Sequence, residues 1–167
     1  MDFHGNSVHQ VGHGHPRVVN AIKAQLDQLP FCPRRYTNQT AIDLASKLAE
    51  LAPDNLNKML FAPGGTNAIG MALKLARYAT GRHKTISMWD SFHGASLDAI
   101  SIGGESLFRK DVGPLMPGSE HIPPPRKGKC HFNCPDENHD GCIEYLKYVV
   151  EMEGDIGALV AEPMRWT

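Results

Sequence analysis

The chain has 167 residues, which is the length of one ordinary domain or of part of a larger one, and it can bury a core without disulfides or metals. Hydrophobic residues make up 41% and charged residues 21%, which excludes a wholly disordered polypeptide. The 17 Lys and Arg residues against 18 Asp and Glu give a net charge of −1, so the basic surplus of a general nucleic-acid binder is missing.

No apolar run reaches the roughly 18 residues of a membrane span, and the start lacks the pattern of a signal peptide. We therefore expect a cytoplasmic protein with neither a nucleic acid nor a membrane as partner. Four Cys residues are too few for a disulfide scaffold, so reduced thiols are expected.

Residues 1–52 are predicted to form an N-terminal arm followed by two helices. The arm up to Pro16 is rich in Gly and His and shows no periodicity. Apolar side chains recur at helical spacing over Arg17–Leu29 and again over Thr40–Leu51, and a proline follows each run.

Residues 53–167 alternate short apolar runs with amphipathic segments and are predicted to form an incomplete α/β domain. Buried strands are expected at Lys58–Ala62, Lys84–Trp89 and Ile156–Ala161. Helices are expected at Asn67–Thr80, Ala95–Ser101 and Cys142–Glu153. This alternation is typical of a parallel sheet covered by helices. Three strands without closing elements make a poor independent domain, which indicates the front part of a larger fold.

The stretch from Gly103 to Asp140 is dense in Pro and Gly and is predicted to be a loop without regular structure. Loops of this length inside a compact domain are uncommon and usually serve a function or an interface.

A glycine-rich turn, Pro63-Gly64-Gly65-Thr66, separates the first predicted strand from a helix. Free N–H groups at a helix N-terminus, together with the helix dipole, suit a phosphate, and Thr66 can add a hydroxyl group. The alternative is a tight turn in which Thr66 or Asn67 only caps the helix. The turn is neither a Walker loop nor a GxGxxG fingerprint.

Two further segments follow the ends of predicted strands. In Phe92-His93-Gly94 the aromatic ring could stack on a flat ligand beside a polar imidazole; the alternative is a core Phe and a surface His. Glu162 directly follows the last strand and needs a hydrogen-bonding partner there. Because the carboxyl ends of parallel strands meet at one edge, an anion site, an aromatic face and an acid are expected together.

The sequence resembles the class III (ω-amino acid type) pyridoxal-phosphate-dependent aminotransferases over nearly its whole length. The resemblance rests on four ordered motifs: Gly12-His13-Gly14-His15-Pro16, the block Pro63–Arg82, Phe92-His93-Gly94, and Ala161-Glu162-Pro163. It implies the fold-type-I large domain, the cofactor pyridoxal 5′-phosphate (PLP), Schiff-base exchange with a small amine or amino acid, and a homodimer. Residues 53–167 would then be the incomplete cofactor-binding domain.

The resemblance also implies roles for individual residues. Gly65 and Thr66, with the Asn67 amide nearby, would hold the cofactor phosphate. Phe92 would stack on the pyridine ring, and His93 and Glu162 would line the cofactor pocket.

The sequence departs from the family pattern at Asn67, where members usually carry Glu, and after Glu162-Pro163, where Met164-Arg165-Trp166 replaces Val/Ile-Gln-Gly. The second change puts ordinary amino-acid transamination in doubt. The whole pattern is most similar to a branch that includes ammonia-lyases acting on hydroxy-aminoethylphosphonate. Arg34 and Arg35 are candidates for binding an acidic substrate group; the alternative is a solvated pair of charges.

None of the nine lysines lies in a context that matches the Schiff-base lysine of this family, which is expected beyond Thr167. Without that amine, Schiff-base exchange has no internal partner and the proton shift has no base. We therefore expect residues 1–167 alone to be inactive.

A second class of function is a zinc-stabilised binding module. Cys130, Cys134, His139 and Cys142 supply enough ligands for tetrahedral zinc, although their spacing differs from that of a zinc knuckle. The alternative is a set of reduced thiols in a loop, so no metal is assigned from the sequence.

Overall fold

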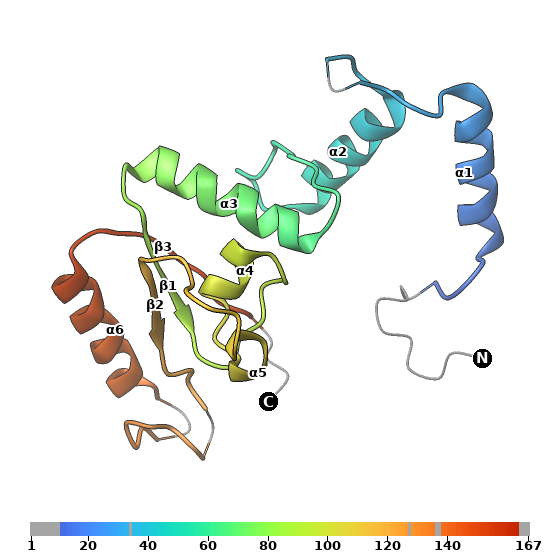
Figure 1. Ribbon diagram of the computed structural model, residues 1–167. Coiled ribbons are helices and arrows are strands. Elements are labelled where there is room, and N and C mark those ends of the chain that lie inside the picture. Colours follow the sequence, from blue (N-terminus) through green and yellow to red (C-terminus); the bar gives the residue numbers. More distant parts are fainter. Residues whose placement is uncertain (1–10, 34, 127, 136–137, 164–167) are drawn as a thin grey trace. The chain divides into compact units, whose positions relative to one another are not determined.

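The computed structural model of the protein describes residues 11–33, 35–126, 128–135 and 138–163 (Figure 1). The chain divides into two compact units, Met1–Leu60 and Phe61–Thr167. No helix in the described ranges is long and apolar enough to cross a membrane.

The first unit contains two helices, and both were predicted from apolar periodicity. Helix α1 spans Pro16–Gln28 and has its proline in the first turn, where the missing N–H costs nothing. Helix α2 spans Gln39–Leu51, and the side chain of Asn38 caps it by accepting a hydrogen bond from the Thr40 N–H at 2.9 Å. Neither helix contains a buried residue.

The second unit is built on a parallel sheet of three strands in the order β2-β1-β3. The strands are β1 (Lys84–Met88), β2 (Ser119–Ile122) and β3 (Ile156–Leu159). Met88 pairs with Ile122, and Ile86 pairs with Leu159. The central strand therefore has the carboxyl end of a neighbour on each side, and the loops that follow all three strands begin at one edge.

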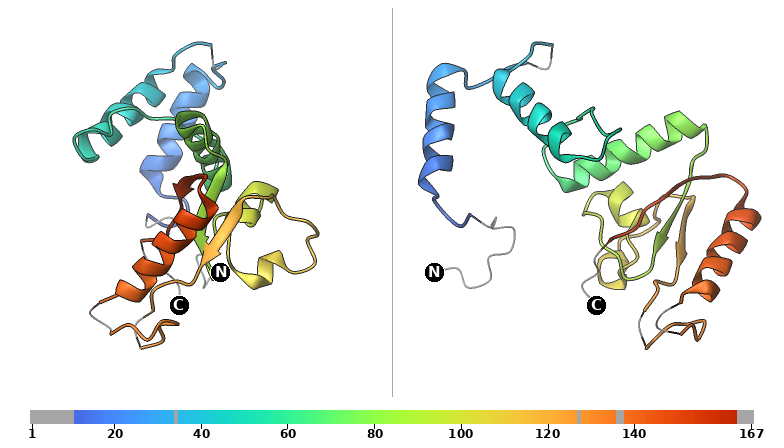
Figure 2. Two further views of the ribbon diagram at one scale, coloured as in Figure 1. Left: turned by 90° about the vertical axis from the view of Figure 1, so that its left-hand side faces the viewer. Right: turned by 180° about the vertical axis from the view of Figure 1, so that it is seen from behind.

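Four helices accompany the sheet: α3 (Gly65–Thr80), α4 (Leu97–Ile102), α5 (Ser106–Arg109) and α6 (Asp140–Glu153). Helix α6 lies on one side of the strands, and α4 and α5 lie on the other, as the views in Figures 1 and 2 agree. Helix α3 contacts both β3 and α4. The buried apolar core combines α3, β1, α4 and β2 through Leu73, Ile86, Ala99, Ile102 and Ile122.

Buried hydroxyl groups tie α4 to the end of β1. The Ser87 hydroxyl donates to the Ile102 carbonyl, and the Ser91 hydroxyl donates to the Met88 carbonyl at 2.6 Å while accepting from the Gly104 N–H at 3.2 Å. A Cβ atom at Gly104 would lie 2.5 Å from Trp89 Cα, so only glycine allows this close passage. These contacts fix the loop that leaves β1, which carries two of the predicted site residues.

The prediction of a strand at Lys58–Ala62 is wrong, because these five described residues form no regular structure. Leu60 is 62% exposed and Phe61 is 45% exposed, so the run is not buried within the chain. An apolar run fixes neither a partner strand nor a direction of burial, and sequence periodicity cannot supply them. The glycine-rich turn that starts α3 therefore follows an extended segment and not a strand.

The stretch from Gly103 to Asp140 is also more regular than predicted, since it contains α5 and β2. Strand β2 has the polar sequence Ser-Glu-His-Ile, which hides its strand character. Its hydrogen-bonded register with β1 determines its conformation. The other predicted elements are present with ends shifted by a few residues; α3, for example, begins at Gly65 and not at Asn67.

Candidate cofactor site at the edge of the sheet

The turn before α3 presents backbone N–H groups that the helix itself cannot use. Gly64 is the N-cap residue and provides no side-chain cap, and its carbonyl accepts the first helical bond from Ala68 N–H at 3.0 Å. The N–H groups of Gly65, Thr66 and Asn67 stand in the first turn, where an α-helix has no internal acceptor for them. In a helix of 16 residues the dipole adds positive potential at this end, so the turn can hold an anion.

The loop after β1 packs directly against this turn. Gly94 is buried and has φ +129°, and a Cβ atom there would lie 3.0 Å from Thr66 Cα and would overlap the Thr66 side chain. Both the backbone conformation and the close approach require glycine at this position. The contact brings the Phe92-His93-Gly94 segment to the glycine-rich turn, as the sequence predicted for these two segments.

The loop after β3 meets the same segment through a hydrogen bond. The Phe92 N–H donates to Glu162 Oε1 at 2.8 Å, which joins residues 70 positions apart in the chain. This bond supplies the partner that a half-buried carboxylate needs. The prediction that three segments meet at one edge is therefore correct for the start of α3 and the loops after β1 and β3.

His93 has an unsatisfied nitrogen within this group. Its Nε2 atom is buried and has no hydrogen-bonding partner in the described part of the chain. Burial lowers the pKa of His93 below its ordinary value, and the Glu162 carboxylate opposes part of that decrease. The imidazole is therefore neutral near pH 7, and its free nitrogen can bond to a ligand.

Phe92 presents an aromatic ring that is 48% exposed and packs on one side against Phe108. The two ring centroids lie 4.7 Å apart and the planes are tilted by 48°. Phe108 was not identified from the sequence, because α5 was predicted as loop. The ring is thus partly supported by the protein and partly available to a flat ligand.

Arg109 and His121 form a further group that the sequence did not indicate. One guanidinium nitrogen, Nη1, donates to the carbonyls of Ile100 at 3.3 Å, Ser101 at 3.0 Å and Gly103. His121 Nε2 lies 3.2 Å from the same nitrogen, and the Trp89 ring stacks on His121 with centroids 4.5 Å apart. This group joins α4, α5 and β2, and it shapes the end of the sheet where the candidate site lies.

Three candidates from the sequence remain: the Asn67 side chain, Arg34 and Arg35. Asn67 is exposed, and its Oδ1 atom lies 3.8 Å from the position of a Cβ atom on Gly64. Arg35 is exposed in the first unit, and Arg34 lies outside the described residues.

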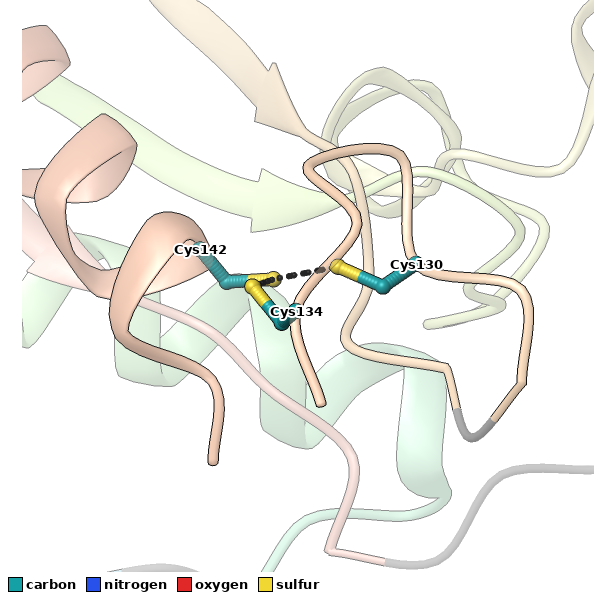
Figure 3. Close-up of side chains that lie close together, drawn as sticks. All are labelled: Cys130, Cys134 and Cys142. Atoms are coloured by element: carbon teal, nitrogen blue, oxygen red, sulfur yellow. Dashed lines mark hydrogen bonds between the residues drawn. The ribbon is translucent and has the colours of Figure 1, made fainter. Parts of the chain in front are cut away.

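A second cluster consists of three cysteines and shares no residue with the candidate cofactor site. Cys142 Sγ lies 3.4 Å from Cys130 Sγ and 3.9 Å from Cys134 Sγ, and the three side chains point toward one another (Figure 3). His139, which the sequence placed among the candidate ligands, does not join this cluster within the described residues.

The pKa values of Cys130 and Cys142 are shifted in opposite directions. Burial alone would raise the pKa of Cys130, but hydrogen bonds from the backbone N–H groups of Cys134 and Phe132 and from the neighbouring thiols lower it to about 7. Burial and the two neighbouring sulfurs raise the pKa of Cys142 to about 12. Cys130 therefore loses its proton far more readily than Cys142.

Comparison with known proteins shows the family. The family model Aminotransferase class-III matches residues 1–165, and the chain belongs to this family. Its fold is that of the fold-type-I transaminases: a thermostable (S)-enantioselective ω-transaminase from Thermomicrobium roseum matches with a TM-score of 0.86 and 30% identity, over 93% of this chain and 37% of that one. An amine transaminase from an uncultivated Pseudomonas species, solved with PLP bound, matches with a TM-score of 0.82 and 29% identity, over 93% and 38%.

Two curated relatives have a higher sequence identity to the chain than these solved structures. The chain is 52% identical to the (R)-1-hydroxy-2-aminoethylphosphonate ammonia-lyase of Vibrio splendidus, over 100% of this chain and 38% of the relative. It is 41% identical to the acetylornithine aminotransferase of Methanopyrus kandleri, over 71% of this chain and 31% of that relative. The chain thus spans well under half the length of the relatives it matches. PLP is the cofactor bound in the Pseudomonas structure and in a taurine:2-oxoglutarate aminotransferase from Bifidobacterium kashiwanohense, which is 27% identical to this chain with a TM-score of 0.82.

Proposed function

We propose that, in the full-length protein, the candidate cofactor site at the edge of the sheet binds PLP. The N–H groups of Gly65, Thr66 and Asn67 would bind the phosphate, and the exposed face of Phe92 would stack on the pyridine ring. His93 and Glu162 would line the ring. The supporting observation is the junction of these segments through the Gly94–Thr66 contact and the Phe92–Glu162 hydrogen bond.

The residues present fit this group. A dianionic phosphate matches first-turn N–H groups that no described side chain caps, and a ring substituent can satisfy the buried Nε2 atom of His93. When bound, PLP withdraws electrons from the carbon that carries the substrate amine. The protein's part is to fix the ring. Glu162 holds the Phe92 backbone in place through its hydrogen bond. Neutral His93 can form one hydrogen bond with the ring and carries no positive charge that would attract the phosphate.

The reaction proposed for the whole protein is Schiff-base exchange with a small amine or amino acid, and two outcomes are open to it. Transamination is the outcome that the family name implies. Loss of ammonia from a hydroxy-aminophosphonate is favoured by one specific observation, which is the 52% identity to the ammonia-lyase over the whole of this chain. Arg35, and Arg34 beside it, are proposed as groups for the acidic end of such a substrate.

The test uses the full-length protein with PLP and (R)-1-hydroxy-2-aminoethylphosphonate. Elimination releases ammonia with no oxo-acid acceptor present, whereas transamination requires an oxo acid and converts it to an amino acid. Release of ammonia without acceptor supports the lyase; acceptor-dependent transfer with the same or another amine supports the transaminase. A protein that binds no PLP would contradict both.

The Schiff-base lysine is proposed to lie outside residues 1–167. Borohydride reduction of the full-length protein with PLP should attach the cofactor to one lysine, which peptide mapping identifies. Attachment within residues 1–167 would contradict the proposal. A polypeptide of residues 1–167 should show little or no attachment.

We also propose that the intact protein is a cytoplasmic homodimer. Its four cysteines are free, which suits a reducing compartment. Large apolar side chains are exposed in both units, among them Ile22, Leu51, Leu60 and Tyr78, and such surface is commonly covered by further chain or by a second subunit. Sedimentation of the full-length protein as a dimer is the expected result.

A further inference from the structure

The three cysteines lie at the spacing of a mononuclear metal site. With zinc–sulfur bonds of about 2.3 Å, tetrahedral geometry places two sulfurs about 3.8 Å apart. The Cys142 sulfur lies 3.4 Å from the Cys130 sulfur and 3.9 Å from the Cys134 sulfur, and all three sulfurs lie within 4.8 Å of one another. The side chains therefore occupy three corners of a tetrahedron with little rearrangement.

The surrounding backbone also matches a thiolate cluster. The N–H of Phe132 donates to Cys130 Sγ at 3.4 Å, a bond from two residues further along that stabilises negative charge on the sulfur. A Cβ atom at Gly141 would lie 3.0 Å from Cys134 Sγ, so the glycine at this position leaves room for that sulfur. Two cysteines come from the loop after β2 and the third from the first turn of α6 (Figure 3).

We propose that Cys130, Cys134 and Cys142 bind one zinc ion. Soft thiolate donors in a tetrahedral arrangement select zinc over magnesium, calcium or manganese. A water molecule, or the ring of His139 after a change of rotamer, can occupy the fourth position. The ion fastens the loop that follows β2 to the start of α6, and this role is independent of PLP.

A disulfide is the main competing state of this cluster. The 3.4 Å between Cys130 Sγ and Cys142 Sγ is well above the roughly 2.05 Å of a disulfide, and all three cysteines are free. A disulfide between two of them would also leave the third, half-buried sulfur beside it without a partner in the cluster. Zinc uses all three sulfurs and disperses their negative charge.

The experiment measures metal in the full-length protein, purified under reducing conditions without added chelator. We expect about one zinc per chain by mass spectrometry. Titration with an organomercurial should release that zinc as the three thiols react. Replacement by cobalt should give the intense visible absorption of tetrahedral thiolate coordination. These three readouts need neither PLP nor activity.

Matched variants separate the cluster from a general effect of thiols. Cys134→Ser should lose at least nine-tenths of the zinc, while Cys32→Ser should keep it, because the partners of Cys32 in the described part of the chain are nearby carbonyls of the first unit. Zinc content of wild type no higher than that of Cys134→Ser would overturn the proposal. So would wild-type protein in which Cys130 and Cys142 are recovered as a disulfide under the same reducing conditions.

Discussion

Gly94 is the residue on which the geometry of the candidate site depends most directly. It combines a φ of +129° with a position where a Cβ atom would overlap the Thr66 side chain. In Gly94→Ala the strained backbone alone should cost about 1–3 kcal/mol of folding stability. The overlap should in addition displace Thr66 and weaken PLP binding, which fluorescence titration of the full-length apo-protein measures.

Gly113→Ala is the matched control for that change. Gly113 also has a positive φ, of +87°, but nothing lies within 4 Å of the position of its Cβ atom. This variant should lose stability by the same backbone mechanism and keep its PLP affinity. Equal PLP affinities of the two variants would mean that the Gly94–Thr66 contact does not shape the phosphate site.

The charge of Glu162 affects the pKa of His93, and a substitution of Glu162 tests this effect. Glu162→Gln keeps an oxygen that can accept from the Phe92 N–H but removes the charge that favours protonated His93. The pKa of His93 should therefore fall further below its ordinary value in the apo-protein, as histidine NMR titration measures. Glu153→Gln, on α6 and paired with Lys84, should leave the pKa of His93 unchanged. A rise in the Glu162→Gln variant would contradict the assigned geometry.

At the scale of elements, Arg109 of α5 joins the end of α4 to His121 of β2. Its guanidinium serves three carbonyls at the end of α4. Arg109→Met keeps an unbranched apolar side chain but removes these bonds, and it should lower the free energy of unfolding by roughly 2–4 kcal/mol in urea denaturation. Arg17→Met, at an exposed position of α1, should change it by less than about 0.5 kcal/mol.

The elements also show which predictions the sequence could support. Helices α1, α2, α3 and α6 have strong apolar periodicity, so local spacing was enough to place them. The predictions for β2 and for residues 58–62 were wrong in opposite directions. Strand β2 is polar and was predicted as loop, but it pairs with β1. Residues 58–62 are apolar and were predicted as a strand, but they pair with no described strand. Strand pairing depends on residues far away in the chain, which a local window does not contain.

At the scale of the whole molecule, two half-buried histidines make stability depend on pH. Burial lowers the pKa of His93 and of His121, and for His121 the charge on Arg109 lowers it further. As pH falls below about 6.5, these two histidines bind protons more readily in the unfolded chain than in the folded one. The free energy of unfolding should therefore decrease there. Urea unfolding at a series of pH values should show this decrease, and His121→Gln should reduce its slope. An unchanged slope would exclude His121 as a source.

By itself the sequence determined the family and predicted the cofactor and the residues proposed to hold it, because these rest on short motifs whose chemistry is local: a glycine-rich helix start, an aromatic-His-Gly segment and a Glu-Pro pair. Only the tertiary structure decided that the Glu162 carboxylate bonds the Phe92 backbone, that Gly94 touches Thr66, and that three cysteines meet without His139. Each of these contacts joins residues brought together by the packing of the sheet and helices, and such packing energy has no counterpart in local sequence patterns.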